Sequence, residues 1–239
     1  MIVRAWGRAA AWTALAAALV GAAVQWAVPA VMEQAASAAA AAWLGEGRYR
    51  VRLEAAPRWH LLLGRFDRVE VAGTDLAVPG VGRLVVVLED LAVDPWALLL
   101  HRALDASGAR RAAFRLELGE NDLAYHLRTR IPFDELAVSL PGGGFRLQGR
   151  LRLGGAAAAV ELEGDFAPGA AAGAQVRLEV DRLRVNGVEV PPFLAEQLLP
   201  LILRPGPVVD LAALLPVPVR ITAVEAGEGL LVIEGEAEL

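Results

Sequence analysis

The residue types that could act as nucleophiles or metal ligands are few and scattered in this chain. Its serines stand in the contexts Ala-Ser-Ala, Ala-Ser-Gly and Val-Ser-Leu, and none of these is a nucleophile elbow. These serines are Ser37, Ser107 and Ser139. The three histidines, His60, His101 and His126, lie in separate segments without the paired spacing of a metal site. The sequence therefore predicts no nucleophile, no metal centre and no cofactor.

Two groups of carboxylates could suggest acid-base chemistry. One group is Glu161, Glu163 and Asp165, and the other is Glu179 and Asp181. Each group alternates with apolar residues, which places it on the polar face of a predicted strand. We expect these side chains to be solvated and paired with Arg from neighbouring strands.

A run of three glycines, from Gly142 to Gly144, could suggest a phosphate-binding loop. It follows Pro141 and precedes a predicted strand, so it lacks the helix N-terminus that such a loop requires. We interpret it as a turn, and with no catalytic constellation elsewhere we expect no enzyme.

An apolar run from Ala9 to Met32 indicates where the chain operates. It is preceded by Arg4 and Arg8 and followed by Glu33. As a helix it would extend about 36 Å, which exceeds a hydrocarbon core of roughly 30 Å. The basic residues precede it, so the bias of Arg toward the cytoplasm puts residues 33–239 outside. We predict a membrane anchor at 1–32 and an extracytoplasmic domain at 33–239.

Two alternatives to an uncleaved anchor stay open. Eleven of the 24 residues in the run are Ala, which inserts less favourably than Leu, and Ala36-Ser37-Ala38 could follow a cleaved secretory signal. In that case the domain would be secreted. The run could also be a buried helix, although Trp12 and Trp26 near its ends suit membrane interfaces.

Composition excludes several partners. The chain has 239 residues, no Cys, and 23 basic residues that are all Arg. Its formal charge of -5 becomes -7 once Arg4 and Arg8 are set aside, and no basic cluster follows them. Nucleic acid is therefore not an expected partner, and lipid recognition would depend on apolar burial rather than on a polybasic patch.

The part after the run reads as an α+β domain that is mainly antiparallel β. An Ala-rich helix is predicted from Val31 to Leu44, ended by Gly45 and Gly47. Alternating apolar residues then predict strands, with a bulge near Asp181-Arg182 where the register shifts. The predicted strands cover 49–55, 66–71, 84–93, 114–118, 136–140, 145–153, 160–166, 176–185, 217–224 and 230–237.

Three shorter helices are predicted between the strands. They cover 95–102, 120–129 and 191–203. The last is apolar on almost every side, so it requires burial or lipid. The strands present more apolar surface than these helices can cover. The sheet could close as a barrel or sandwich, curl around helices, or leave a lined groove for a hydrophobic ligand.

Three segments give the chain a resemblance to the LmeA-like phospholipid-binding proteins of bacterial envelopes. They are Gly64–Val71 with Gly73 after it, Leu118–Leu123, and Val185–Pro191. In the last segment, Asn186-Gly187 predicts a hairpin-type turn. The chain departs from the family at Gly119, where a hydroxyl residue is usual, but Gly also serves as an N-cap. The resemblance implies a strongly curved antiparallel sheet wrapped around a long helix, similar to tubular lipid-binding proteins, with an apolar cavity. It also implies an extracytoplasmic role in envelope lipid biology and no catalysis.

We therefore predict a membrane-anchored phospholipid-binding protein that holds acyl chains in an apolar groove, for lipid transfer or envelope biogenesis. The predicted groove residues are Phe145, Leu147, Leu151, Val160, Leu162, Phe166, Leu194, Leu198, Leu199 and Ile202. Periodicity alone does not separate a lined cavity from a dry core. The alternative is a non-catalytic structural or interaction module with a closed β core. A lipid or glycan enzyme would need an ionisable residue turned inward.

Overall fold

The computed structural model describes residues 28–76, 79–101, 108–128, 130–153, 156–169, 173–215 and 217–238. The chain divides into two compact units. Unit 1 comprises Met1–Gly45, Tyr49–Val71 and Val87–Arg110, and unit 2 comprises Glu46–Arg48, Ala72–Val86 and Arg111–Leu239. Most of the predicted anchor lies outside the described residues. Among the described helices, none is both long and apolar enough to span a membrane.

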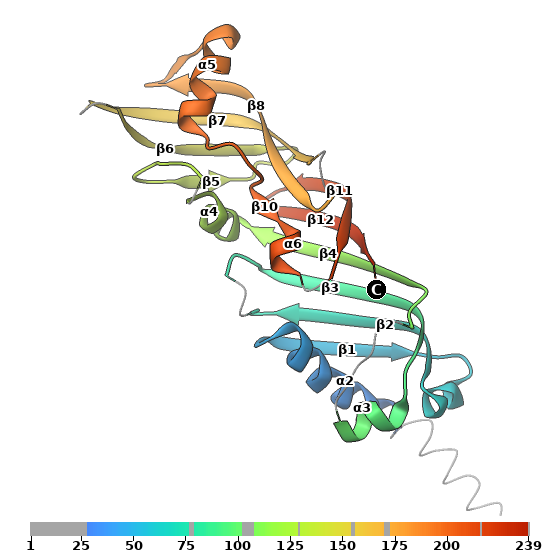
Figure 1. The fold of residues 1–239 in the computed structure, drawn as a ribbon. Coiled ribbons are helices and arrows are strands. Elements are labelled where there is room, and N and C mark those ends of the chain that lie inside the picture. Colours follow the sequence, from blue (N-terminus) through green and yellow to red (C-terminus); the bar gives the residue numbers. More distant parts are fainter. Residues whose placement is uncertain are drawn as a thin grey trace, which may run out of the picture. The chain divides into compact units, whose positions relative to one another are not determined.

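Antiparallel strands dominate both units, which confirms the predicted α+β class (Figure 1). The strands of the first sheet are β1 (Arg48–Glu54), β2 (Arg65–Thr74), β3 (Arg83–Ala92), β4 (Arg111–Gly119), β11 (Val219–Gly227) and β12 (Leu230–Ala237). Their order is β1-β2-β3 in unit 1 and β3-β4-β12-β11 in unit 2, because the division falls within β3.

The second sheet lies wholly in unit 2. Its strands are β5 (Ala137–Ser139), β6 (Phe145–Leu153), β7 (Ala156–Pro168), β8 (Gln175–Val185), β9 (Val188–Glu189) and β10 (Val209–Asp210). The order is β10-β8-β7-β6-β5, with β9 paired to β8. Neither sheet closes on itself, so a closed barrel is not formed by the described strands.

Helix α2 (Val28–Leu44), in unit 1, buries one methionine and several of its alanines. Met32, Ala36, Ala39 and Ala40 are buried, and the carboxylate of Glu33 accepts a hydrogen bond from the backbone N–H of Leu53 in β1. The helix ends as predicted at Gly45, which has φ +91°. The alternation in β1 is confirmed, since Val51 is buried while the arginines on either side of it are exposed.

Two shorter helices complete unit 1. The 3-10 helix η2 (Arg58–Leu63) was not predicted, whereas α3 (Pro95–His101) was. A carboxylate oxygen of Asp94 accepts a hydrogen bond from the N–H of Trp96 at the start of α3. Helices α2, α3 and η2 pack against one another.

The second sheet carries two predicted irregularities. Glu163 pairs with Arg182 while Gly164 pairs with Val180, so Asp181 is the extra residue of a β-bulge. Asn186 and Gly187 both have positive φ, which is the geometry of a tight hairpin turn between β8 and β9. Both predictions are confirmed.

The helices of unit 2 are short. They are α4 (Glu120–Arg128), α5 (Pro192–Ile202) and α6 (Leu211–Leu214), and α6 was not predicted. At the start of α4 the carboxylate of Asp122 accepts a hydrogen bond from the N–H of Gly119, so the cap survives without a hydroxyl residue. The resemblance implied a long helix, but within unit 2 the longest described helix is α5, with 11 residues.

Candidate functional site

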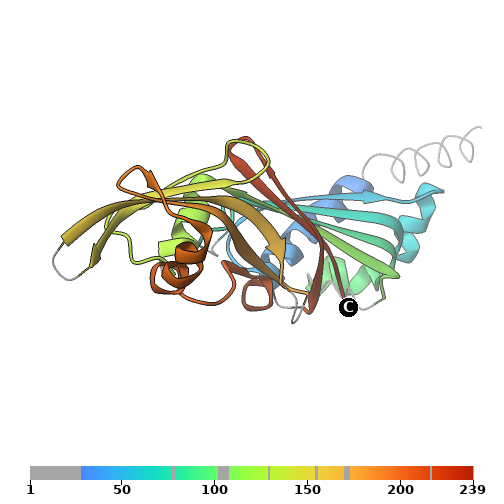
Figure 2. The same ribbon diagram turned by 90° about the horizontal axis from the view of Figure 1, so that it is seen from above.

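The candidate site is the apolar face of the second sheet, on which α5 lies (Figures 1 and 2). In β6 and β7, alternate residues point to this face because side chains alternate along a strand. Five of the predicted groove residues lie here and are at most 3% exposed: Phe145, Leu147, Leu151, Val160 and Leu162. Register pairs Leu147 with Leu162 and Leu162 with Leu183. The face is therefore a continuous apolar floor.

The remaining predicted groove residues lie at the margins of this floor. Phe166 is partly buried, and its ring meets that of Phe145 edge to face at 5.2 Å between centroids. Ile202 is buried, and Leu198 and Leu199 are half-buried against the core. Leu194 is 40% exposed. The structure therefore brings nine of the ten residues into or against one apolar cluster, and leaves Leu194 at the surface.

Helix α5 covers the floor thinly. Among its side chains only Ile202 is buried, while Phe193 and Leu201 are largely exposed. Prolines stand at both ends: Pro191 is the N-cap, Pro192 is the first residue of the helix, and a Pro-Gly-Pro segment follows it at 205–207. A segment with few buried apolar contacts opens at low free energy, so α5 is the element best suited to move aside.

A pocket of about 350 Å³ lies in the same unit beside α6. Its lining combines apolar residues with cationic and hydroxyl groups: Tyr125, His126, Arg128, Arg130, Pro207, Val208, Asp210, Ala213 and Leu214. Val208 is buried in the apolar cluster and Leu214 packs against it. The pocket is therefore amphiphilic, with an apolar floor and cationic side chains.

The pocket lining contains two arginines and one carboxylate. Within the described chain, neither Arg128 nor Arg130 forms an ion pair with a carboxylate. Asp210, the acidic residue in the lining, accepts hydrogen bonds from the N–H of Ala212 and from Gln175. The pocket therefore retains cationic groups that could bind an anion.

Sequence reasoning missed this pocket. It is assembled from the end of α4 and from the segment around β10 and α6, which pair or pack only in the folded chain. The available signal was a pair of arginines, at 128 and 130, at the end of an amphipathic helix.

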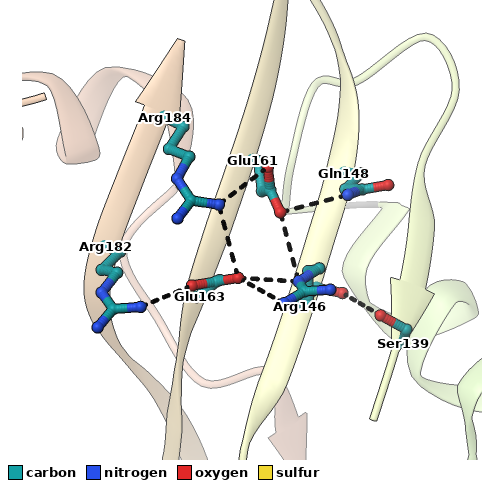
Figure 3. Close-up of polar contacts among 7 residues, drawn as sticks. All are labelled: Ser139, Arg146, Gln148, Glu161, Glu163, Arg182 and Arg184. Carbon is teal, nitrogen blue, oxygen red and sulfur yellow. Dashed lines mark hydrogen bonds and ion pairs between the residues drawn. The ribbon is translucent and has the colours of Figure 1, made fainter. Parts of the chain in front are cut away.

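The opposite face of the second sheet is a network of ion pairs (Figure 3). Arg146 contacts Glu163 at 2.8 Å and Glu161 at 3.3 Å, and Arg182 and Arg184 reach the same carboxylates from β8. The hydrogen bond from Arg146 holds the pKa of Glu163 below its ordinary value. A general acid at neutral pH requires the opposite shift. The predicted cross-strand pairing is confirmed for Glu161 and Glu163, whereas Asp165, Glu179 and Asp181 form no ion pair with Arg in the described chain.

Several of the histidines and serines make local contacts. His60 packs edge to face on Trp59, and Nε2 of His126 is 2.8 Å from the carbonyl oxygen of Gly80. Ser37 donates a hydrogen bond to the carbonyl of Glu33, and Ser107 lies outside the described residues. Within the described chain no group of three potential ligands could hold a metal ion.

Comparison with known proteins gave one match. A family model described as LmeA-like phospholipid-binding matches residues 23–236, which is nearly the whole chain. No curated protein and no solved structure matches the sequence.

Proposed function

The chain belongs to the LmeA-like phospholipid-binding family, and from that premise we propose that unit 2 buries phospholipid acyl chains between α5 and the apolar floor of β6–β8. One observation carries this proposal. The continuous apolar floor is covered by α5, and only one side chain of that helix is fully buried. Displacing such a helix exposes a surface that an acyl chain can cover again.

The driving force is apolar burial. Removing a CH₂ group from water contributes about 0.8 kcal/mol, so a chain of some 14 carbons offers on the order of 10 kcal/mol before the costs of binding. This is enough for affinity without a specific polar contact. It also fits the acidic net charge of the domain, which does not favour attraction to anionic headgroups over long distances.

The headgroup would lie in the pocket beside α6. Arg128 and Arg130 supply guanidinium groups that bind phosphate with charge-assisted hydrogen bonds, while Val208 and Leu214 extend the apolar surface below them. An anionic amphiphile matches both properties. We propose that the anion bound here is the lipid phosphate.

The apolar run before α2 supports a location at a membrane. We propose that residues 1–32 anchor the chain and that the domain acts outside the cytoplasm, in lipid transfer or envelope biogenesis. A cleaved leader would leave the same lipid-binding domain secreted.

The test is photocrosslinking of the full chain, in membranes, with a phospholipid that carries a diazirine on its acyl chain. We expect labelled peptides from β6–β8 and α5. Leu198→Asp, on the half-buried side of α5, should reduce labelling at least about tenfold, because it places a carboxylate against the floor. Leu201→Asp is the matched control, since Leu201 is exposed on the same helix. Equal labelling of both variants would refute the proposed site.

A second experiment tests the headgroup pocket. Arg128→Gln and Arg130→Gln should each weaken binding of an anionic phospholipid by about tenfold, the effect of losing one charge-assisted hydrogen bond. Arg177→Gln, at an exposed position on β8, should leave binding within twofold. Equal losses for all three variants would indicate a general charge effect and not a phosphate site.

An interaction module with a closed core is the second candidate function. It is favoured by the deep burial of the floor residues, which are already packed within the protein. It predicts no acyl-chain labelling of β6–β8, so the same crosslinking experiment separates the two functions.

A further inference from the structure

Large exposed apolar side chains gather on three elements of unit 1. Trp59, Leu62 and Leu63 are on η2, and Trp96 and Leu100 are on α3, while Val31 is in the first turn of α2. Their exposed fractions range from 47% to 70%. The three elements pack against one another (Figure 1). We call these six residues the Trp surface.

The exposure of the Trp surface is built into the fold. Helices η2 and α3 each bury a different side chain, Leu61 and Leu98, which leaves their bulkier residues outward. Gly64 ends η2 with φ +68°, and its carbonyl accepts a hydrogen bond from the N–H of Val93 at 2.8 Å. A side chain at Gly64 would collide with the carbonyl of Val93, so this close approach requires glycine. The connection holds η2 next to the segment that begins α3.

The polar residues near the Trp surface suit a lipid interface. Arg65 and Arg68 are exposed at the start of β2. Asp67 and Asp94 accept hydrogen bonds from the backbone N–H groups of Ala56 and Trp96, which ties both carboxylates to the backbone of this region. Trp together with Arg is the composition that proteins place at the level of lipid headgroups.

The sequence before α2 favours a lipid bilayer as the partner of the Trp surface. Residues 9–27 are almost entirely apolar and lead directly into Val28, the first residue of α2. If this run enters a bilayer, the first turn of α2 lies at the bilayer surface, and Val31 is in that turn. The elements packed on α2 are then within reach of the same surface.

We propose that the Trp surface docks onto the lipid bilayer, inserting Trp59, Trp96 and the adjacent leucines at the headgroup level. The proposal rests on the anchor of the proposed function but not on the acyl-chain site in unit 2. Docking gives unit 1 a second attachment to the membrane besides the anchor.

The test uses the lack of cysteine in this chain, which allows one fluorophore to be attached at a chosen position. The full chain would be reconstituted into vesicles of phosphatidylcholine and phosphatidylglycerol, with or without brominated acyl chains that quench fluorescence on contact. An environment-sensitive probe would be attached to Leu62→Cys, Leu100→Cys or, as control, Val188→Cys. Val188 is also an exposed apolar residue, but it lies on β9 in unit 2.

We expect brominated lipid to quench the Leu62→Cys and Leu100→Cys probes at least about twofold more than the Val188→Cys probe. Adding Trp59→Ser and Trp96→Ser should abolish that difference while the chain stays on the vesicles through its anchor. Equal quenching at the three positions, or a difference that survives the Trp changes, would overturn the proposal. A surface that binds a protein partner instead would give no quenching on these vesicles.

Two controls keep the outcome interpretable. The Trp positions are exposed, so the double variant should retain its circular dichroism and melting curve, and Leu62→Asp with Leu100→Asp provides a second variant with the same expected loss. Acyl-chain photocrosslinking in unit 2 should persist in both variants. Loss of crosslinking in the unmodified chain would refute the proposed function while leaving the docking result intact.

Discussion

Helices α2 and α5 are both apolar, but they fit their surroundings in different ways. Helix α2 turns small residues inward, and Ala36, Ala39 and Ala40 are buried. Helix α5 is rich in Leu, Phe and Pro, yet only Ile202 is buried. Alanines spaced three and four residues apart allow a helix backbone to approach its neighbours closely, whereas large side chains hold it away. Apolar content therefore does not measure how firmly a helix is held.

The difference assigns separate roles to the two helices. A helix packed through small side chains has no room to rearrange, which suits a fixed part of unit 1. A helix with large, partly exposed side chains can exchange its contacts for those of a ligand of similar polarity. This contrast fits a structural role for α2 and, for α5, the role of cover in the proposed lipid site.

The same substitution in both helices should give the largest contrast. Ala36→Leu adds volume to a fully buried position and should lower the stability of unit 1 by about 1–3 kcal/mol. Ala195→Leu, at a half-buried position of α5, should change the stability of unit 2 by no more than about 0.5 kcal/mol. Hydrogen exchange resolved by mass spectrometry measures both units in the full chain. Equal losses would mean that α5 is packed as tightly as α2.

A smaller effect on stability is expected from a substitution in the sheet beneath α5. The pKa of Glu163 is lowered from 4.5, chiefly by the hydrogen bond from Arg146, so its folded-state pKa lies below the unfolded value. Its stabilising contribution is therefore complete above pH 4.5 and is lost as the pH falls through the lowered pKa.

For such a partly exposed network we expect a difference of about 1 kcal/mol between the wild type and Glu163→Gln at pH 7. That difference should shrink at a pH well below 4.5, as measured by exchange of the β6–β8 amides. Exchange of α2 amides should not depend on this substitution at either pH. A pH-independent difference would contradict the ion-pair explanation.

The smallest expected effect is a change in the stability of unit 1. The hydroxyl of Tyr49 in β1 is buried without a hydrogen-bond partner in the described chain, and burial raises its pKa. Tyr49→Phe should leave unit 1 as stable as the wild type or more stable by about 0.5–1 kcal/mol, because it removes an unsatisfied polar group. Tyr125→Phe, at an exposed position in unit 2, should be neutral. Loss of stability in the Tyr49 variant would reveal a partner for the hydroxyl.

Regular periodicity made much of this fold predictable. Alternation identified the long strands, the register shift located the bulge at Asp181, and Asn186-Gly187 indicated a hairpin turn. These features are local, because each depends on residues close together in the chain. The two-residue strand β10 and the four-residue helix α6 are too short to show a period, and η2 has no strong one.

The site was less accessible to prediction for a physical reason. Residues 191–203 predict a helix that is apolar on almost every side. Which of its sides is exposed depends on the elements that pack against it, and the sequence of the helix alone does not show this. The Arg128 and Arg130 pocket forms only when β10 pairs with β8, far along the chain. The assignment of the ten groove residues to lipid contact stays a prediction, although nine of them share one apolar cluster.

The first strand has a consequence for how this chain behaves among its copies. Strand β1 is at the end of its strand order, so one side of its backbone has no neighbouring strand in the described sheet. Three of its four exposed positions carry arginines, of which Arg48 pairs with Asp75 while Arg50 and Arg52 follow it along the strand. An open strand edge can template pairing with another chain, and a row of like charges makes such pairing repulsive. Edge-to-edge polymerisation of this chain through β1 is thereby disfavoured.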